Sequence, residues 1–177
     1  NTISRQVDDI GKLIDEFSSF ARMPEAEIKL DNLSKCLKES FLLFSNSHKN
    51  IKFSINIDND KQDIYFQFDK FQLSQCFNNL IKNAVEAVEK IPNPSVSINL
   101  CIKNNKIFIE VMDNGIGIAK EMVNKIFEPY FTTKNKGTGL GLYISYGIIK
   151  KHDGEISYQP LDKGSCFKIT LPALVAE

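Results

Sequence analysis

The stretch Asp113-Asn-Gly-Ile-Gly-Ile118 follows directly on Lys106-Ile-Phe-Ile-Glu-Val-Met112, in which apolar and polar residues alternate. The alternation predicts a β-strand, so Asp113 stands at the end of the strand, where its side chain can face a ligand. Two glycines close together permit a sharp turn or the close approach of a ligand to the backbone. A carboxylate at this point can accept a hydrogen bond from an amino group such as that of adenine. An ordinary turn is the alternative interpretation.

A second glycine cluster, Gly137-Thr-Gly-Leu-Gly-Leu142, leads into a predicted helix over residues 140–151. The backbone N–H groups and the positive end of such a helix can bind phosphate, although either cluster alone is a weak signal. Residues 128–138 lie between the two clusters, lack apolar periodicity and contain Pro, Thr, Lys and Gly. We expect this stretch to be a lid over a ligand; a plain surface loop is the alternative.

The third element is a predicted helix with polar side chains along one face. Its apolar residues recur at helical spacing: Leu73, Phe77, Leu80, Ile81, Ala84 and Val88. The polar row, at spacings of three and four, is Gln72, Gln75, Asn79, Asn83 and Glu86. Asn is a poor residue for a helix interior, and solvated faces are usually rich in Lys and Glu. Amide oxygens are hard ligands that suit Mg²⁺ on a phosphate.

Four motifs in order give the chain its resemblance to a known family. They are Asn79-Leu-Ile-Lys-Asn83-Ala, Asp113-Asn-Gly-Ile-Gly, Phe127-Glu-Pro-Tyr-Phe131-Thr-Thr-Lys134 and Gly137-Thr-Gly-Leu-Gly141-Leu. These are similar to the N, G1, F and G2 boxes of the ATP-binding domain of bacterial sensor histidine kinases, within the wider ATPase superfamily of gyrase B, Hsp90, histidine kinases and MutL. The resemblance covers about residues 31–172. It implies a Bergerat-type fold and binding of ATP with Mg²⁺.

The resemblance also implies roles for single residues. Asp113 would bind the adenine amino group, Gly115 and Gly117 would let the backbone close over the base, and Asn83 would hold Mg²⁺, with Asn79 and Glu86 beside it. Many relatives have a basic residue where Glu86 stands, which puts a direct contact by Glu86 in doubt. The expected phosphate cradle is Thr133, Lys134, Gly137, Thr138, Gly139, Leu140 and Gly141, with Lys134 on the β- or γ-phosphate. Phe127 and Phe131 would anchor the lid rather than touch nucleotide.

Composition excludes several classes of protein. The 22 basic and 22 acidic residues give no formal net charge, which argues against an electrostatic nucleic-acid binder. The four cysteines stand singly, so neither a zinc site nor a disulfide framework is indicated; a reducing, cytoplasmic location fits. No apolar run is long enough to span a membrane. There is no P-loop motif and no eukaryotic-type kinase motif.

The remaining chain predicts an α+β fold: a two-layer α/β sandwich whose mostly antiparallel sheet has helices on one face. Helical periodicity starts after Asp31 or Asn32, one of which would cap the helix, and Asp69 would cap the helix of the polar row. Predicted strands cover residues 51–57, 64–68, 95–103, 106–112, 155–159 and 166–171, with the second pairing the first and Asn104-Asn105 forming a hairpin turn. We expect a short helix over residues 119–127.

Residues 1–21 carry a heptad seam of Ile3, Val7, Ile10, Ile14, Phe17 and Ala21, and Pro24 ends the helix; an ordinary amphipathic helix is the alternative. The segment resembles the second helix of a dimerisation and histidine-phosphotransfer domain. Its sequence is especially similar to that of sensor kinases of the NtrY nitrogen-regulation type. We therefore expect a partial bundle helix at 1–23, a linker at 24–30 and the catalytic domain at 31–177. The start without Met suggests a piece of a longer protein.

The two histidines do not fit a phosphoacceptor motif. His48 lies in a polar stretch and is expected at the surface, whereas His152 lies in Lys151-His-Asp-Gly-Glu-Ile, which resembles the family's structural His-Gly-Gly-x-Ile segment with Asp153 in place of the first glycine. The resemblance implies an ATP-dependent protein-histidine kinase of a two-component phosphorelay, whose acceptor histidine is outside this chain. Its expected partners are its own phosphotransfer domain, a second copy in the longer protein and, indirectly, a response regulator, with no nucleic acid. We expect this domain to be cytoplasmic and the longer protein to be anchored in the bacterial inner membrane.

Two alternatives stay open. An Hsp90- or MutL-like ATPase switch would hydrolyse ATP, but such proteins usually need a carboxylate one turn before the Mg-binding Asn, where this chain has Asn79. A nucleotide-binding regulator without kinase activity is the non-enzyme alternative.

Overall fold

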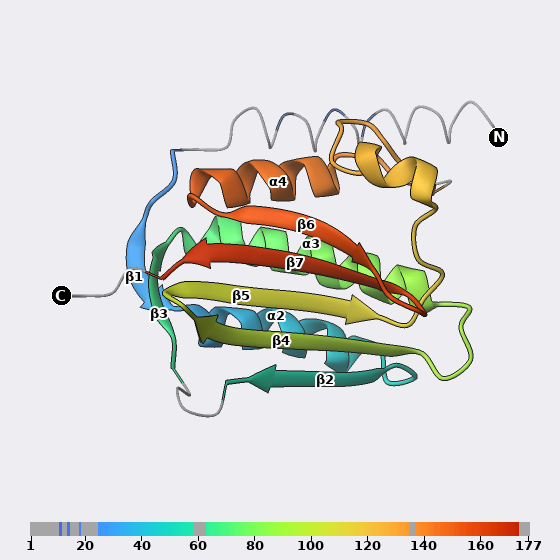
Figure 1. The fold of residues 1–177 in the computed structure, drawn as a ribbon, viewed down its shortest axis with the longest axis horizontal. Coiled ribbons are helices and arrows are strands. Elements are labelled where there is room, and N and C mark those ends of the chain that lie inside the picture. Colours follow the sequence, from blue (N-terminus) through green and yellow to red (C-terminus); the bar gives the residue numbers. More distant parts are fainter. Residues whose placement is uncertain are drawn as a thin grey trace.

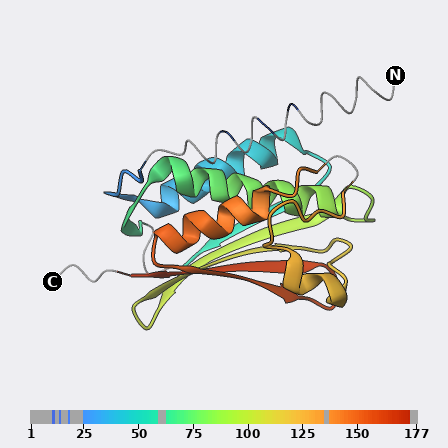
Figure 2. The ribbon, with the colours of Figure 1, turned by 90° about the horizontal axis from the view of Figure 1, so that it is seen from above.

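The structure is a computed structural model that describes positions 11, 14 and 18 and residues 25–58, 63–134 and 137–173. The predicted heptad helix lies outside the described residues except for these three helical positions, so its packing stays a prediction. The elements in chain order begin with a short strand and alternate strands with three longer helices. The predicted α+β sandwich is confirmed: one layer is a sheet, and the other layer is helical (Figures 1 and 2).

The main sheet has five strands. They are, in spatial order, β2 (Lys52–Ile57), β4 (Ser95–Lys103), β5 (Lys106–Asp113), β7 (Ser165–Pro172) and β6 (Glu155–Pro160). The β2–β4 pair is parallel and the other three pairs are antiparallel. At the β4–β5 turn, Asn104 and Asn105 both have positive φ, 50° and 56°, which a two-residue hairpin turn of this kind requires. This part of the fold follows the sequence prediction.

The helices α2 (Leu33–Ser47), α3 (Lys70–Val88) and α4 (Gly141–Lys151) cover one face of the sheet (Figure 2). Alternate residues of the central strands point into the core between the layers; among them Ile98 and Ile109 have no exposed surface. Both predicted caps are present, since the Asn32 side chain accepts from the Lys35 N–H and the Asp69 side chain from the Gln72 N–H. None of the helices in the described part of the chain is long and apolar enough to cross a membrane.

Two predicted elements differ from the structure. The strand β3 (Tyr65–Phe68) does not pair with β2; it forms a separate two-stranded sheet with β1 (Lys29–Asn32), a strand that begins in the expected linker and ends in the expected catalytic domain. Alternation shows which side chains of a strand face the core, but it does not identify the neighbouring strand, and β2 pairs with β4 instead. The predicted helix at 119–127 is a 3₁₀ helix, η1 (Lys120–Lys125), which is wound more tightly than the expected α-helix.

His152 ties the helical layer together at the end of α4. It is 4% exposed, its Nε2 lies 3.0 Å from the Asp69 backbone nitrogen, and its Nδ1 lies 2.8 Å from the Ile148 carbonyl oxygen. Because the Asp69 N–H must donate, Nε2 is the acceptor and Nδ1 carries the proton. The following Asp153 adopts φ 54°, the left-handed conformation that a glycine would take most easily. The structural role expected for this segment is thereby confirmed.

Candidate functional site

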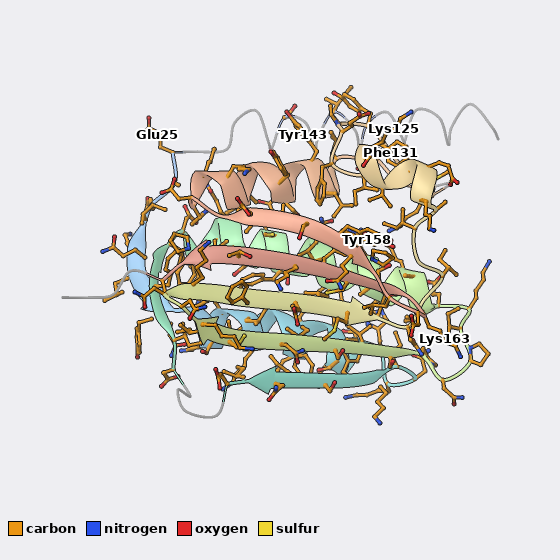
Figure 3. The ribbon with its side chains drawn as sticks, viewed as in Figure 1. Glu25, Lys125, Phe131, Tyr143, Tyr158 and Lys163 are labelled. Carbon is orange, nitrogen blue, oxygen red and sulfur yellow. The ribbon has the colours of Figure 1, made fainter. Side chains whose placement is uncertain are left out.

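One cavity of about 550 Å³ opens between α3, the end of β5 and the loops that precede α4. All four sequence motifs contribute to its wall. In Figure 3, Phe131 lies near the start of α4 and Tyr158 lies over β6 and β7, at the same end of the molecule. The lining residues are Asn79, Lys82, Asn83, Glu86, Ala87, Asp113, Ile116, Gly117, Ile118, Ile126, Phe131, Thr132, Thr133, Lys134, Gly137, Thr138, Gly139, Gly141, Leu142, Ser165 and Phe167.

Asp113 is the polar group of the apolar end of this cavity. It is the last residue of β5 and is 5% exposed, with Ile118 and Phe167 among its neighbours in the cavity wall. Burial raises the pKa of its carboxyl, and hydrogen bonds from the backbone N–H groups of Gly115 and Ser165 oppose that shift. The Gly115 N–H lies 2.8 Å from Oδ1. Because each carboxylate oxygen has two lone pairs, this buried group can still accept a hydrogen bond from one amino group of a ligand.

The turn after Asp113 is attached to the helical layer. Gly115 lies against Ala87 of α3, so closely that an added Cβ would be 2.5 Å from the Ala87 carbonyl oxygen. The next N–H, of Ile116, donates to that same oxygen at 3.4 Å. Asn114 joins the turn to the start of β4, because its side chain accepts from the Ser95 N–H at 2.8 Å and donates to the Asn93 carbonyl at 2.9 Å. Gly115 is therefore a packing residue and does not line the cavity.

The β6–β7 hairpin holds the other side of this turn. Gly164, with φ 90°, packs against the Asp113 carbonyl so tightly that any Cβ would overlap it. The Tyr158 hydroxyl accepts the Ile118 N–H at 3.1 Å, and its ring contacts Phe167 edge-on with centroids 5.5 Å apart. Tyr158 lies outside the cavity but fixes two residues that line it. No motif pointed to Tyr158, because its contact joins residues 40 positions apart.

The second glycine cluster forms the opposite end of the cavity. Gly139 has φ 72° and packs on the Tyr130 carbonyl, and Gly141, the first residue of α4, packs on the Asn79 side chain. A side chain at either position would overlap these atoms. The first N–H groups of α4 have no acceptor within the helix, so they and the helix dipole favour an anion here. Leu140 is 2% exposed and belongs to the core, not to the cavity wall.

The polar row of α3 divides between the cavity and the core. Asn79, Asn83 and Glu86 line the cavity, and Asn79 Nδ2 donates to Ser145 Oγ of α4 at 2.9 Å. Gln72 is 1% exposed at the other end of α3, with no hydrogen-bond partner for its amide. Gln72 and Gln75, which share the predicted polar face, do not line the cavity.

Lys134 crosses from the loop to α3. Its Nζ donates to Asn83 Oδ1 at 2.8 Å and forms a hydrogen-bonded ion pair with Glu86. Lys82, one turn before Glu86, lies 4.0 Å from the same carboxylate. Sequence reasoning placed Lys134 beside phosphate but missed its two protein partners. Phe131, expected only to anchor the loop, lines the cavity.

Neither histidine lies in the cavity wall. His48 ends α2 and is half-buried, with Nδ1 3.0 Å from the Phe44 carbonyl oxygen. The four cysteines are free. Among the described residues, no group of three or more His, Cys, Asp or Glu side chains could hold a metal ion.

Sequence comparison places these features among known proteins. The family model for histidine kinase-, DNA gyrase B- and HSP90-like ATPases matches residues 68–175. The nitrogen regulation protein NtrY of Azorhizobium caulinodans is 35% identical over 180 residues, covering 98% of this chain and 23% of that protein. Sporulation kinase A of Bacillus subtilis is 41% identical over 143 residues, covering 80% of this chain and 23% of that kinase. The chain thus spans about a quarter of the length of these relatives.

Solved structures agree with the sequence matches. The catalytic domain of histidine kinase ThkA is 33% identical, with a TM-score of 0.75, and the match covers 83% of this chain and 96% of that domain. ThkA in complex with the response regulator protein TrrA is 27% identical, with a TM-score of 0.79 over 98% of this chain and 50% of that one. Both matches concern the same fold, and the second reaches nearly the whole of this chain.

Proposed function

The chain belongs to the histidine kinase-, DNA gyrase B- and HSP90-like ATPase family as an ATPase domain of the sensor-histidine-kinase kind, and we propose that it transfers the γ-phosphate of Mg-ATP to a histidine outside its own sequence. The observation that carries this proposal is the cavity itself. It joins one buried carboxylate at an apolar end to a helix N-terminus and a lysine at the other end. That order matches the order of base and phosphates in a nucleotide.

The apolar end suits adenine. The Asp113 carboxylate accepts from the backbone N–H groups of Gly115 and Ser165 and keeps lone pairs with which it would accept from the exocyclic amino group. Guanine would bring a carbonyl oxygen to that position, and two acceptors facing each other in a buried site repel. Ile118, Ile126 and Phe167 would surround the flat faces of the base, which is the usual composition of a small-molecule pocket.

The polar end suits a triphosphate with Mg²⁺. Asn83 offers an amide oxygen at the cavity wall, and Mg²⁺ commonly takes only one or two protein ligands beside phosphates and water. This fits the lack of a carboxylate or histidine cluster in the part of the chain that the structure describes. When bound, Mg²⁺ would neutralise phosphate charge. Gly139 and Gly141 would bring backbone N–H groups to the phosphates, Gly137 would shape the turn through its N–H bond to the Lys134 carbonyl at 3.3 Å, and Lys134 would add a positive charge.

Phosphoryl transfer needs positioning and electrostatic stabilisation more than covalent chemistry. The residues of this chain would orient the γ-phosphate and stabilise its charge, while the nucleophile, an imidazole nitrogen, arrives from the phosphotransfer helix. Transfer is favoured over hydrolysis by Asn79. Its side chain donates to Ser145 and packs on Gly141, and an amide cannot take a proton from attacking water as a carboxylate would.

The partners follow from the same proposal. In the longer protein, residues 1–23 would contribute one helix to a phosphotransfer domain, and that domain would dimerise and supply the acceptor histidine. The response regulator that accompanies ThkA in its solved complex supports a response regulator as the final acceptor here. Anchoring of the longer protein in an inner membrane belongs to the same set of expectations.

The test uses γ-labelled ATP with this chain alone and with a second protein that carries a phosphoacceptor hairpin. We expect acid-labile label only on the second protein, and none when its acceptor histidine is replaced by glutamine. Label on the isolated chain that maps to His48 or His152 would contradict the proposal. So would release of inorganic phosphate at the same rate with and without the acceptor, which would instead support an ATPase switch.

A further inference from the structure

We propose that Glu86 is a positioning residue that holds Lys134 against helix α3 until nucleotide phosphates draw the lysine away. The inference rests on the proposed ATP site, and it gives Glu86 a role other than contact with nucleotide or metal. The observation that supports it is that the Lys134 ammonium binds both Glu86 and Asn83 Oδ1.

The contact occupies atoms that the bound nucleotide would use. Asn83 Oδ1, the oxygen proposed for Mg²⁺, lies 2.8 Å from Lys134 Nζ. An ammonium and a divalent cation on the same oxygen repel each other at short range. Two of the three N–H donors of Lys134 are occupied by Asn83 and Glu86 and cannot contact phosphate in this arrangement. Lys134 must therefore leave Asn83 before Mg-ATP can bind as proposed.

The strength of the pair suits an exchangeable contact. The Lys134 and Glu86 side chains are 43% and 33% exposed, and ion pairs with this much solvent access shift an equilibrium only about two- to fivefold. A triphosphate carries several negative charges and can outcompete one carboxylate. A deeply buried pair would instead have kept Lys134 in place.

Glu86 keeps a positively charged neighbour when Lys134 moves to the phosphates. Lys82 lies one helical turn earlier on α3 and is already 4.0 Å from the Glu86 carboxylate. Pairs at this spacing support a helix on their own. The two lysines thus give Glu86 a partner in both arrangements, which explains how a carboxylate can stand in a cavity wall beside a site for phosphate.

The loop before Lys134 depends on this contact. The other hydrogen bonds described for residues 128–134 are local: the Lys134 N–H donates to Thr132 Oγ1 at 3.1 Å, and the backbone bonds join residues three positions apart, as in Phe131 N–H to the Glu128 carbonyl at 3.4 Å. Among the described residues, the Lys134 side chain joins this loop to α3 by a hydrogen bond to Asn83 and an ion pair with Glu86. Loss of the pair should release the loop while the rest of the domain stays folded.

Hydrogen exchange without nucleotide tests the holding contact directly. In Glu86→Gln, we expect peptides from residues 128–134 to exchange about two- to fivefold faster than in the wild type. The matched control is Glu89→Gln, which removes the same charge from the exposed end of α3 and should leave the loop unchanged. Equal exchange in Glu86→Gln and wild type would overturn the proposal.

Calorimetry with Mg-ATP gives the second measurement. Because Glu86→Gln frees Lys134 in advance, we expect the Kd for ATP to stay the same or to fall by up to about fivefold. A Kd that rises tenfold or more would show that Glu86 contacts nucleotide or metal, and would overturn the proposal. The double variant Glu86→Lys with Lys134→Glu swaps the two charges and should restore slow hydrogen exchange in the loop. It should not restore ATP affinity, because position 134 then carries a carboxylate. A merely structural role of Glu86 would not separate these two results. If the wild type binds no ATP, the proposed function fails, whereas the exchange experiment still decides the role of Glu86.

Discussion

The two ends of the cavity are built differently. At the base end, the turn after Asp113 is fixed by backbone contacts to α3, by Asn114 to the start of β4, and by the β6–β7 hairpin through Gly164 and Tyr158. At the phosphate end, the loop that carries Lys134 reaches α3 through one half-exposed ion pair and one amide contact. The base end is therefore held by several backbone contacts, whereas the loop that carries Lys134 at the phosphate end contacts α3 through exchangeable side-chain contacts.

The difference has a functional reason. Recognition of one base among several requires a preformed acceptor, because a carboxylate that could turn aside would accept other ligands. Transfer of phosphate requires groups that can close on a substrate and later release it. The same contrast sets the order of the effects expected from substitutions at the two ends.

The largest effect is expected where a turn glycine at the base end gains a side chain. Gly164→Ala would force a methyl group into the Asp113 carbonyl and strain a residue with φ 90°. We expect the free energy of unfolding to fall by about 2–5 kcal/mol, from strain and overpacking together. Urea denaturation measures it. Gly139→Ala, with φ 72° and an overlap with the Tyr130 backbone, should cost only about 1–2 kcal/mol, because the attached loop can shift. Equal losses would remove the distinction between the two ends.

Asp113→Asn should act on binding and spare the fold. The amide presents a donor where the adenine amino group needs an acceptor, and loss of a hydrogen bond to a charged group costs about 1.5–3 kcal/mol, or roughly 10- to 150-fold in Kd. Isothermal titration with ATP measures the loss. The control is Ser165→Ala, at the neighbouring position. This variant keeps the Asp113 carboxylate and should lose less ATP affinity than Asp113→Asn. An unchanged Kd for Asp113→Asn would refute the assignment of the base site.

Asp113→Asn should weaken ATP binding, but it should leave the free energy of unfolding at neutral pH unchanged or raise it. Since burial raises the pKa of Asp113 in the folded state, the folded protein binds that proton more tightly than the unfolded chain does. Its contribution to stability is full below the unfolded pKa and is lost as the pH rises through the raised folded pKa. At neutral pH the wild type therefore bears the cost of a buried charge, and the variant should unfold at the same or a higher urea concentration. A clear loss of stability at neutral pH would mean that the carboxylate holds the turn together.

A smaller effect is expected from Tyr158→Phe. The substitution removes the hydroxyl that accepts the Ile118 N–H and keeps the ring against Phe167. One neutral hydrogen bond contributes about 0.5–1.5 kcal/mol, so ATP affinity should fall roughly two- to twelvefold. Titration of the variant beside Tyr65→Phe, whose exposed ring lies on β3, separates the lost hydrogen bond from a general effect of tyrosine loss. Equal affinities in the two variants would show that the turn needs no support from β6.

Local features of the fold could be predicted from the sequence. Periodicity located the helices and strands, and short-range chemistry located the Asn32 and Asp69 caps and the Asn104-Asn105 turn, because each depends on residues within a few positions. The neighbour of β2 could not be predicted, since strand pairing joins residues about 40 positions apart. The motifs likewise identified much of the cavity wall, but Gly115 and Leu140 do not line it, and the supporting residues were not identified.

The candidate site shows the same limit. Asp113, Asn79 and Gly141 come together as the motifs suggested, because glycines and amides in such places are unusual enough to stand out in a sequence. Tyr158 and Ser145 look like ordinary strand and helix residues, and only the fold brings them to Ile118 and Asn79. Glu86 was noticed for its position, but its partner Lys134 lies 48 residues away, so their contact could not be read from the sequence.

The most direct measurement of the central claim is a calorimetric titration of the wild-type chain with Mg-ATP, with Mg-GTP as the matched competitor. If the buried Asp113 carboxylate reads the adenine amino group at a preformed base end, ATP should bind at least about 100-fold more tightly than GTP, because guanine leaves two acceptors face to face. Binding of both nucleotides with the same affinity, or of neither, would contradict the account.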